Sequence, residues 1–402
     1  MESIAATRVA RRQSRLFERV DTDAISIWAL AGGLVLYLSL DGGGYDILVY
    51  SQVGIVLWWI VLVAAAWGLL PRARVTRGAW LAIAAFGGFV AWTAVATTWS
   101  LSSERSLQDL SLVAGYLGVL VLAISINPAR DRAVWHTVNV VAAAIVVVAG
   151  LALASRLRPG LFAAATQTST YLPGTQGRLA WPLNYWNALG ALTALGIPLL
   201  LAIASSARTL KGQAAAAAGI PLVALCGYLT FSRGGAGACA IGVIAFLLMA
   251  PDRVPKVASA LVSAAGSAAV IAAAVDRGAI EHGLANSAAR HQGTTLAVAL
   301  ALVCAGVALA QVGIGLAVRH GMPPRWLVLP RARVRWLSVG ALVACLIVHA
   351  PARVSRAWEE FKHTLLDRDL HHWWAPEQAR ASAQGPAGIE RLLGFGEVMD
   401  RT

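Results

Sequence analysis

Long apolar stretches alternate with short polar segments along the chain up to about residue 350. Each stretch approaches the ~20 residues that an α-helix needs to cross the ~30 Å hydrocarbon core of a bilayer. Nothing in that core can satisfy free backbone N–H and C=O groups, so the stretches predict helices. We predict an all-α, polytopic membrane protein with about eleven transmembrane helices, at residues 25–40, 47–70, 79–99, 107–126, 133–154, 188–206, 213–231, 234–250, 257–275, 294–318 and 336–350.

Composition supports this prediction. Of the 402 residues, 58% are hydrophobic and 13% are charged, against about 25% charged residues in soluble domains. The formal net charge of +13 would favour nucleic-acid binding in a soluble protein. In a membrane protein it has a simpler cause, because lysine and arginine are retained in the cytoplasmic connections.

The basic residues are distributed unevenly between alternate connections. Those on the side of the N-terminus carry nineteen lysine and arginine residues, and the others before residue 352 carry seven: Arg105, Arg156, Arg158, Arg178, Arg233, Arg277 and Arg290. The excess places the N-terminus in the cytoplasm and the C-terminal tail outside. We therefore expect contact with the lipid bilayer and no contact with nucleic acid.

The predicted helices divide the chain into parts. We expect a basic cytoplasmic N-terminus, a membrane unit of five helices, an extracytoplasmic loop, a second membrane region and a polar extracytoplasmic tail, at residues 1–24, 25–154, 155–187, 188–350 and 351–402. The outside loops 41–46, 100–106 and 276–293 carry acidic residues and histidines, whereas the inside connections are short and basic. Any chemistry is therefore expected on the outside.

Cofactor motifs are not found in the sequence. All four cysteines fall within predicted helices, without zinc spacing. The GGAGA segment at 234–238 follows no predicted strand, and no GxxxxGK[ST] phosphate loop is present. We expect neither a metal nor a cofactor.

Two outside arginines break the charge pattern. Arg178 lies in GRLAWPLNYWNALG, directly before a predicted helix, and Arg233 lies in LTFSRGG at a tight turn between two helices. An arginine near membrane depth costs a few kcal/mol unless it reaches the headgroups or is paired. Asn187 is predicted to cap the helix that follows Arg178. The glycines after Arg233 allow backbone to approach a ligand closely.

A basic recess at the membrane surface suits a lipid-linked diphosphate. The guanidinium group binds phosphate oxygens in a bidentate manner and remains charged at any working pH. Trp181 and Trp186 suit the interfacial aromatic belt or stacking on a sugar, and Asn184 and Asn187 supply polar contacts.

The two arginine motifs, GRLAWPLNYWNALGALTALGIPLLL and LTFSRGGAGACAIGVIAFLL, resemble the O-antigen ligase and polymerase superfamily of bacterial membrane proteins. The resemblance covers residues 170–250 well and the layout of 20–350 loosely. It implies a glycosyltransferase of the bacterial cytoplasmic (inner) membrane that works without nucleotide sugar or metal. Such an enzyme moves a glycan from undecaprenyl diphosphate to a lipid or glycan acceptor. Arg178 and Arg233 match the positions that hold the diphosphate; ligase and polymerase remain open.

The transfer reaction needs a base that removes the acceptor's hydroxyl proton, and a carboxylate or a histidine can serve. The candidates are His363, Glu281 and His282, with Glu359, His371 and His372 also on the outside.

The C-terminal part departs from the resemblance. Members of the superfamily continue with a large outside loop and return to the membrane, whereas RVSRAWEEFKHTLLD at 353–367 is followed by an Ala/Gly/Arg-rich segment without helical periodicity. We expect a truncation or a frame change near residues 370–375. A truncated, catalytically silent member is therefore one alternative to an active glycosyltransferase. A transporter or flippase of a lipid-linked saccharide is another.

Overall fold

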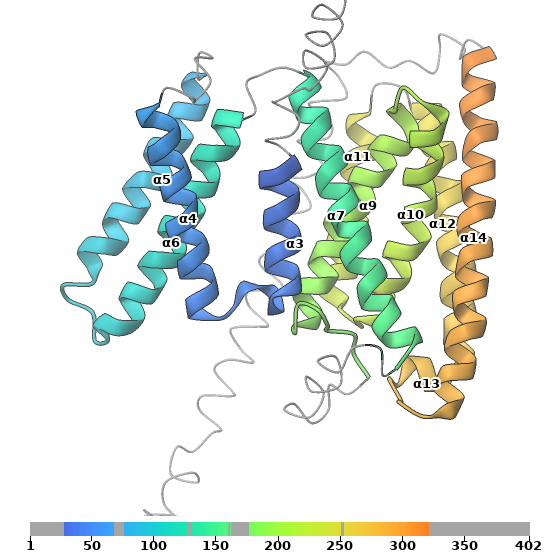
Figure 1. The fold of residues 1–402 in the computed structure, drawn as a ribbon. Helices are drawn as coiled ribbons and strands as arrows, with labels where there is room; N and C mark the ends of the chain where they lie inside the picture. The colour runs from blue at the N-terminus through green and yellow to red at the C-terminus, as the bar shows by residue number, and fades with distance from the viewer. Residues whose placement is uncertain are drawn as a thin grey trace, which may run out of the picture. The chain divides into compact units, whose positions relative to one another are not determined.

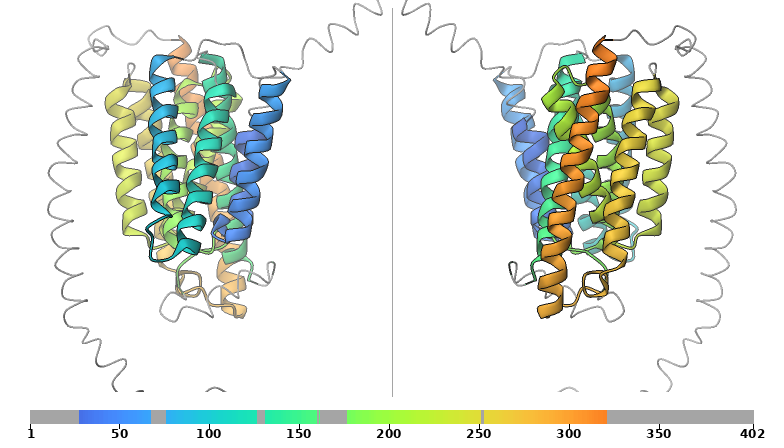
Figure 2. Two further views of the ribbon diagram at one scale, coloured as in Figure 1. Left: turned by 90° about the vertical axis from the view of Figure 1, so that its left-hand side faces the viewer. Right: turned by 90° about the vertical axis from the view of Figure 1, so that its right-hand side faces the viewer.

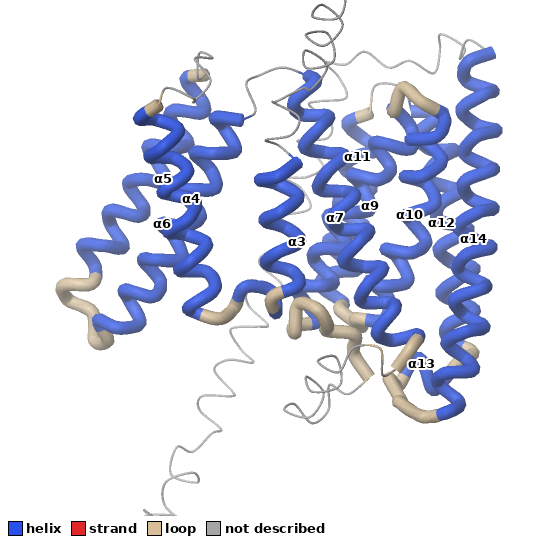
Figure 3. Tube along the Cα trace, in the orientation of Figure 1, coloured by secondary structure: helices blue, strands red, loops and turns tan. Residues whose placement is uncertain are grey.

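A computed structural model describes residues 28–67, 76–126, 131–159, 161, 177–250 and 253–320. In these ranges the chain is built from helices, without a strand (Figures 1 and 3). Eight described helices are long and apolar enough to cross a membrane, and the apolar helices Trp28–Leu40 and Arg233–Met249 are shorter. The prediction of an all-helical, multi-pass membrane protein is thus confirmed. The predicted helix at 336–350, the tail at 351–402 and His363 lie outside the described residues.

The helices follow the predicted order. They are α3 (Gly33–Leu40), which continues the π-helix η1 (Trp28–Gly32), then α4 (Ile47–Ala66), α5 (Arg77–Ala96), α6 (Ser103–Ile126), α7 (Asp131–Leu157), α9 (Trp186–Ser206), α10 (Leu210–Leu229), α11 (Arg233–Met249), α12 (Arg253–Val275), α13 (Gly278–Glu281) and α14 (Ser287–His320). A 3-10 turn, η2 (Gly42–Gly44), connects α3 to α4.

Helices α4 and α5 both pack against α6 (Figure 1). The contact between α4 and α6 buries Leu57, Val61 and Leu122, and the Trp58 indole Nε1 donates to the Ala114 carbonyl oxygen at 2.9 Å. By contrast, α5 has no buried residue. Its large side chains remain available to lipid. This costs little, because lipid tails are as apolar as these side chains and no hydrophobic effect drives the helix against a neighbour.

The main core lies among α7, α9, α10, α12 and α14, which form one bundle (Figures 1 and 2). Helix α10 contacts each of the other four. Glycines make close approach possible there: a Cβ on Gly196 of α9 would lie 2.6 Å from the Ile145 side chain of α7. Close packing of this kind replaces the hydrophobic effect as the force between helices in lipid.

The region 276–293, predicted as an outside loop, is largely helical. Helix α14 begins at Ser287 rather than at residue 294, because the Asn286 Oδ1 accepts a hydrogen bond from the Ala289 amide at 2.9 Å and caps the first turn. The short α13 precedes it, and its Ala279 amide donates to Gln292 Oε1 at 3.1 Å. The polar residues of this region therefore belong to a folded unit.

Candidate functional site

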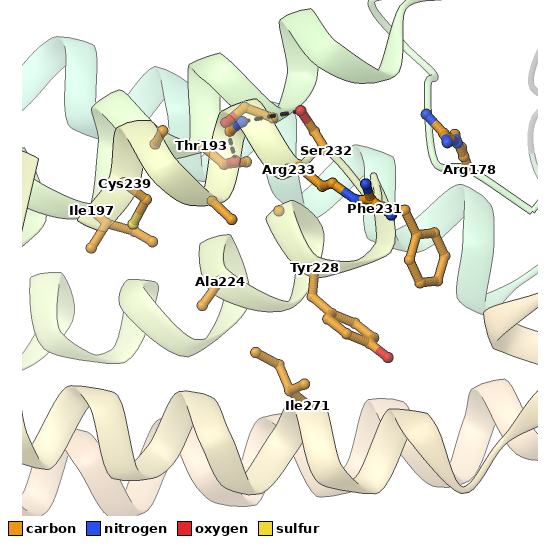
Figure 4. A pocket seen from close by; sticks show the side chains of 15 residues that line it. Arg178, Thr193, Ile197, Ala224, Tyr228, Phe231, Ser232, Arg233, Cys239 and Ile271 are labelled. Atoms are coloured by element: carbon orange, nitrogen blue, oxygen red, sulfur yellow. Dashed lines mark hydrogen bonds between the residues drawn. The ribbon is translucent and has the colours of Figure 1, made fainter. Parts of the chain in front are cut away.

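A cavity of about 570 Å³ lies between α9, α10, α11 and α12. Arg178 and Arg233 both line it, although they are 55 positions apart in the sequence (Figure 4). Figure 4 shows both arginines on the same side as Phe231 and Tyr228, while Ile197 and Cys239 lie on the other side. The cavity therefore has a cationic and an apolar part.

The α10–α11 turn positions Arg233 as the first residue of α11. Phe231 has a positive φ of 50°, a left-handed conformation that reverses the chain within a few residues. Ser232 is the N-cap of α11, and its Oγ accepts a hydrogen bond from the Gly235 amide at 3.1 Å. Thr230 supports the turn, because its Oγ1 accepts from the Ser232 amide at 3.2 Å.

The segment before α9 positions Arg178. Its neighbour Leu179 is buried, and the Leu179 amide donates to the Leu229 carbonyl oxygen of α10 at 2.8 Å. The Arg156 guanidinium, at the end of α7, donates to the Gly177 carbonyl oxygen. Arg156 is therefore a structural residue that holds the segment in place. The Trp181–Pro182 peptide bond in the same segment is cis.

Arg178 lies over the Trp186 ring, with 5.2 Å between the guanidinium carbon and the ring centroid. Such a cation–π contact orients the cation without neutralising it. Within the described residues, neither Arg178 nor Arg233 forms a salt bridge, and both side chains are exposed. Two positive charges therefore remain available at the cavity.

The prediction that Asn187 caps α9 is wrong. The N-cap is Tyr185, without a side-chain hydrogen bond, and Asn187 lies in the first turn. Its Oδ1 accepts from Ser232 Oγ at 2.8 Å, and its Nδ2 donates to the Tyr185 hydroxyl at 3.0 Å. Asn187 consequently connects the helix that follows Arg178 to the turn that carries Arg233. Only the tertiary contact between α9 and α11 provides this partner.

Helices α9 and α11 meet at two glycines beside the cavity. A Cβ on Gly235 would lie 2.9 Å from the Gly190 backbone carbon, and one on Gly190 would lie 2.8 Å from the Ser232 Cβ. Both values are below what real Cβ atoms show, so larger residues would separate the helices. Of the two glycines after Arg233, Gly235 thus serves helix packing, whereas Gly234 is exposed.

An aromatic row leads away from Arg178. Trp186 contacts Tyr185 at 5.2 Å between centroids, and Tyr185 contacts Tyr45 at 6.1 Å, both edge to face. Tyr45 belongs to the DGGGYD loop (41–46), in which Gly42, Gly43 and Gly44 all have positive φ. A Cβ on Gly42 would lie 3.0 Å from Asn184 Nδ2, so this loop lies against the segment before α9. Burial, then Tyr185 and Tyr116, raise the pKa of the Tyr45 phenol.

Two of the predicted base candidates lie near this site. The Glu281 Oε1 accepts a hydrogen bond at 3.2 Å from the hydroxyl of Tyr228, which lines the cavity. The Gly177 backbone lies against the backbone of Glu281 and His282, and the His282 side chain is exposed. In the described ranges, no three His, Cys, Asp or Glu residues group as a metal site would require.

Sequence reasoning identified both arginines and missed Tyr228, Ser232 and Thr193, which also line the cavity. Ser232 had a detectable signal, because a serine directly before an apolar segment of helical length is a typical N-cap. Tyr228 had none, because a tyrosine near the end of an apolar helix is also typical of the interfacial belt.

No protein-family model, curated protein or solved structure matches the chain. The fold and the apolar helices define the class of the protein: a multi-pass, all-helical membrane protein. Its described part contains a partly cationic cavity at one end of the helices.

Proposed function

We propose that this protein transfers a glycan from undecaprenyl diphosphate to an acceptor hydroxyl on the outer face of a bacterial cytoplasmic membrane. Arg178 and Arg233 hold the diphosphate in this proposal, and the end of the helices that carries them faces outwards. The observation that carries the proposal is the pairing of these two arginines at a single cavity, without a carboxylate to neutralise either within the described residues.

The charge at the cavity suits a leaving diphosphate. As the anomeric C–O bond breaks, negative charge develops on the departing oxygen, and fixed positive groups stabilise that charge most strongly where water is excluded. Each charge-assisted hydrogen bond contributes about 1.5–3 kcal/mol. The cation–π contact of Arg178 with Trp186 fixes one guanidinium before the substrate binds, which reduces the entropy lost on binding.

The apolar part of the cavity suits the lipid carrier. Ile197 lies eleven residues after Trp186 on α9, or about 16 Å along the helix axis. Cys239 and Ala224 line the same part of the cavity. An amphiphile with an anionic head and a hydrocarbon chain fits this cavity, because the head meets the cationic part and the chain meets the apolar part.

The remaining predicted contacts surround the arginines. Trp181, Asn184, Trp186 and Asn187 all belong to the segment that carries Arg178 or to the first turn of α9. We assign Trp181 and Asn184 to the saccharide or the membrane interface, because Asn184 is exposed and Trp181 partly so. Trp186 and Asn187 position the arginines through the contacts described above. No metal or cofactor is part of the proposal.

Binding of the carrier is tested by protection of Cys239 from alkylation. Undecaprenyl diphosphate should protect Cys239 from N-ethylmaleimide, while Cys304, away from the cavity, should react as before. Mass spectrometry of the two cysteine peptides measures both rates. Arg178→Ala and Arg233→Ala should each weaken protection about tenfold or more, the equivalent of one lost charge-assisted hydrogen bond.

Arg290→Ala provides the matched control, because Arg290 is an exposed arginine in the first turns of α14 that does not line the cavity. Glycan transfer is then measured in a strain that lacks its own ligase and polymerase. Transfer that disappears in the two cavity variants and persists in Arg290→Ala supports the proposal. Protection that is equal in all variants contradicts it.

A further inference from the structure

Tyr228 connects a carboxylate to the cavity. Its ring belongs to the last turn of α10 and lines the cavity, and its hydroxyl donates to Glu281 Oε1 at 3.2 Å. The Phe231 ring lies beside it at 5.5 Å between centroids. Figure 4 shows these two rings on the arginine side of the cavity. A proton acceptor is therefore present near the two cations.

Glu281 is held in place by its surroundings rather than by a flexible loop. The preceding Ile280 is fully buried, and the Ala279 amide is bound by Gln292 of α14 at 3.1 Å. The Glu281 and His282 backbone also supports Gly177, the neighbour of Arg178. Glu281 and Arg178 are thus positioned by one set of contacts, which suits groups that act on the same substrate.

We propose that Tyr228 and Glu281 together accept the proton of the acceptor hydroxyl. This inference rests on the proposed function. The acceptor O–H gives its proton to the Tyr228 oxygen while the phenolic proton passes to Glu281, and the acceptor oxygen forms a bond to the anomeric carbon. The anomeric C–O bond breaks, and its electron pair leaves with the diphosphate. Glu281 then returns its proton to water, and Tyr228 is unchanged.

The arrangement divides the two requirements of the reaction between two groups of residues. The arginines stabilise the charge of the leaving group, and the Tyr228–Glu281 pair removes the proton that makes the acceptor a better nucleophile. Loss of an arginine should therefore weaken donor binding, whereas loss of the pair should slow the chemical step.

The test uses the full chain in nanodiscs, with undecaprenyl-diphosphate-linked glycan and acceptor lipid from the strain that lacks its own ligase and polymerase. Tyr228→Phe keeps the ring without the hydroxyl, and Glu281→Gln keeps the size without the charge. Proton transfer to a positioned side chain contributes about 10²–10⁴-fold, so kcat should fall about 100-fold in each variant. The KM for the donor should stay within about twofold, because donor binding depends on the arginines.

Glu104→Gln is the control, since Glu104 is exposed in the first turn of α6. In Glu281→Ala, added formate should restore part of the rate, because a small carboxylate can replace the missing one; a purely structural role would not respond. Undiminished kcat in both Tyr228→Phe and Glu281→Gln overturns this inference but not the proposed function. The same holds if Glu281→Ala loses Cys239 protection and formate does not restore its rate. Absent transfer and absent protection by undecaprenyl diphosphate in the unmodified chain overturn the proposed function as well.

Discussion

Helices α5 and α9 are almost equally long and both are apolar enough to cross a membrane. No residue of α5 is buried, whereas half of the most apolar window of α9 is. Both contain small residues, but Gly87 and Gly88 of α5 have open space beside them, while Gly190 and Gly196 of α9 lie against other helices. Apolarity thus brings a helix into the membrane, and complementary partners decide whether it packs.

Their polar groups differ in the same way. On α5, Thr93 Oγ1 donates to the Phe89 carbonyl oxygen of its own helix at 2.9 Å. On α9, the Asn187 side chain accepts a hydrogen bond from Ser232 in the α10–α11 turn. A polar side chain that bonds to its own helix does not fix the position of another helix, whereas one that bonds across helices does. The candidate site is therefore built around α9.

The largest effect is expected from Gly235→Ala. The new Cβ would meet the Gly190 backbone at 2.9 Å, and overpacking of this kind costs about 1–3 kcal/mol. Gly87→Ala, with nothing within 4 Å, should instead stabilise α5 by about 0.5–1 kcal/mol, since alanine loses less backbone entropy. Melting temperatures in detergent micelles should shift in opposite directions. Melting temperatures that shift by the same amount in the same direction in both variants would contradict the distinction between packed α9 and unpacked α5.

A smaller effect is expected from Ser232→Ala, which removes a buried helix-cap hydrogen bond and the partly buried hydrogen bond to Asn187. The loss should be about 2 kcal/mol, with weaker Cys239 protection because Arg233 follows the altered residue. Thr76→Ala removes only the cap of α5, where Thr76 Oγ1 accepts from the Ala79 amide at 3.2 Å. It should cost about 1 kcal/mol or less and leave protection unchanged. Thermal unfolding and the alkylation assay measure the two quantities.

The smallest effect is expected from Trp186→Leu, which removes the cation–π contact with Arg178. A loss of about 1 kcal/mol corresponds to about fivefold weaker binding of undecaprenyl diphosphate. Trp92→Leu on α5 is the control, because Trp92 is exposed and contacts Trp99 rather than a cation. Binding that Trp186→Leu leaves unaltered would show that Arg178 is oriented without the indole.

Much of the architecture was predictable from the sequence, because both α5 and α9 enter the membrane through their own apolarity. A membrane helix is recognised from its own composition, so ten of the predicted helices coincide with described helices, including the two short ones. Helix boundaries were predicted less well. The first turns of α14 and the cap at Asn286 depend on contacts that hydropathy does not register.

The candidate site was predictable in part. Arg178 and Arg233 could be recognised because each departs from the uneven distribution of lysine and arginine between the two sides of the membrane. That distribution is a property of the sequence alone. Glu281 could be proposed only as one acidic residue among several. Its hydrogen bond to Tyr228 joins residues 53 positions apart, and no local pattern encodes such a pairing.

The sequence by itself determined that the chain enters the membrane, where its helices lie, and which charges are unusual, because apolarity and charge act residue by residue. The tertiary structure decided which helices are packed, that the two arginines share one cavity, and that Asn187 connects α9 to Ser232 instead of capping it. Those outcomes depend on which surfaces meet. In lipid, close contact between small residues and hydrogen bonds between helices select the partners.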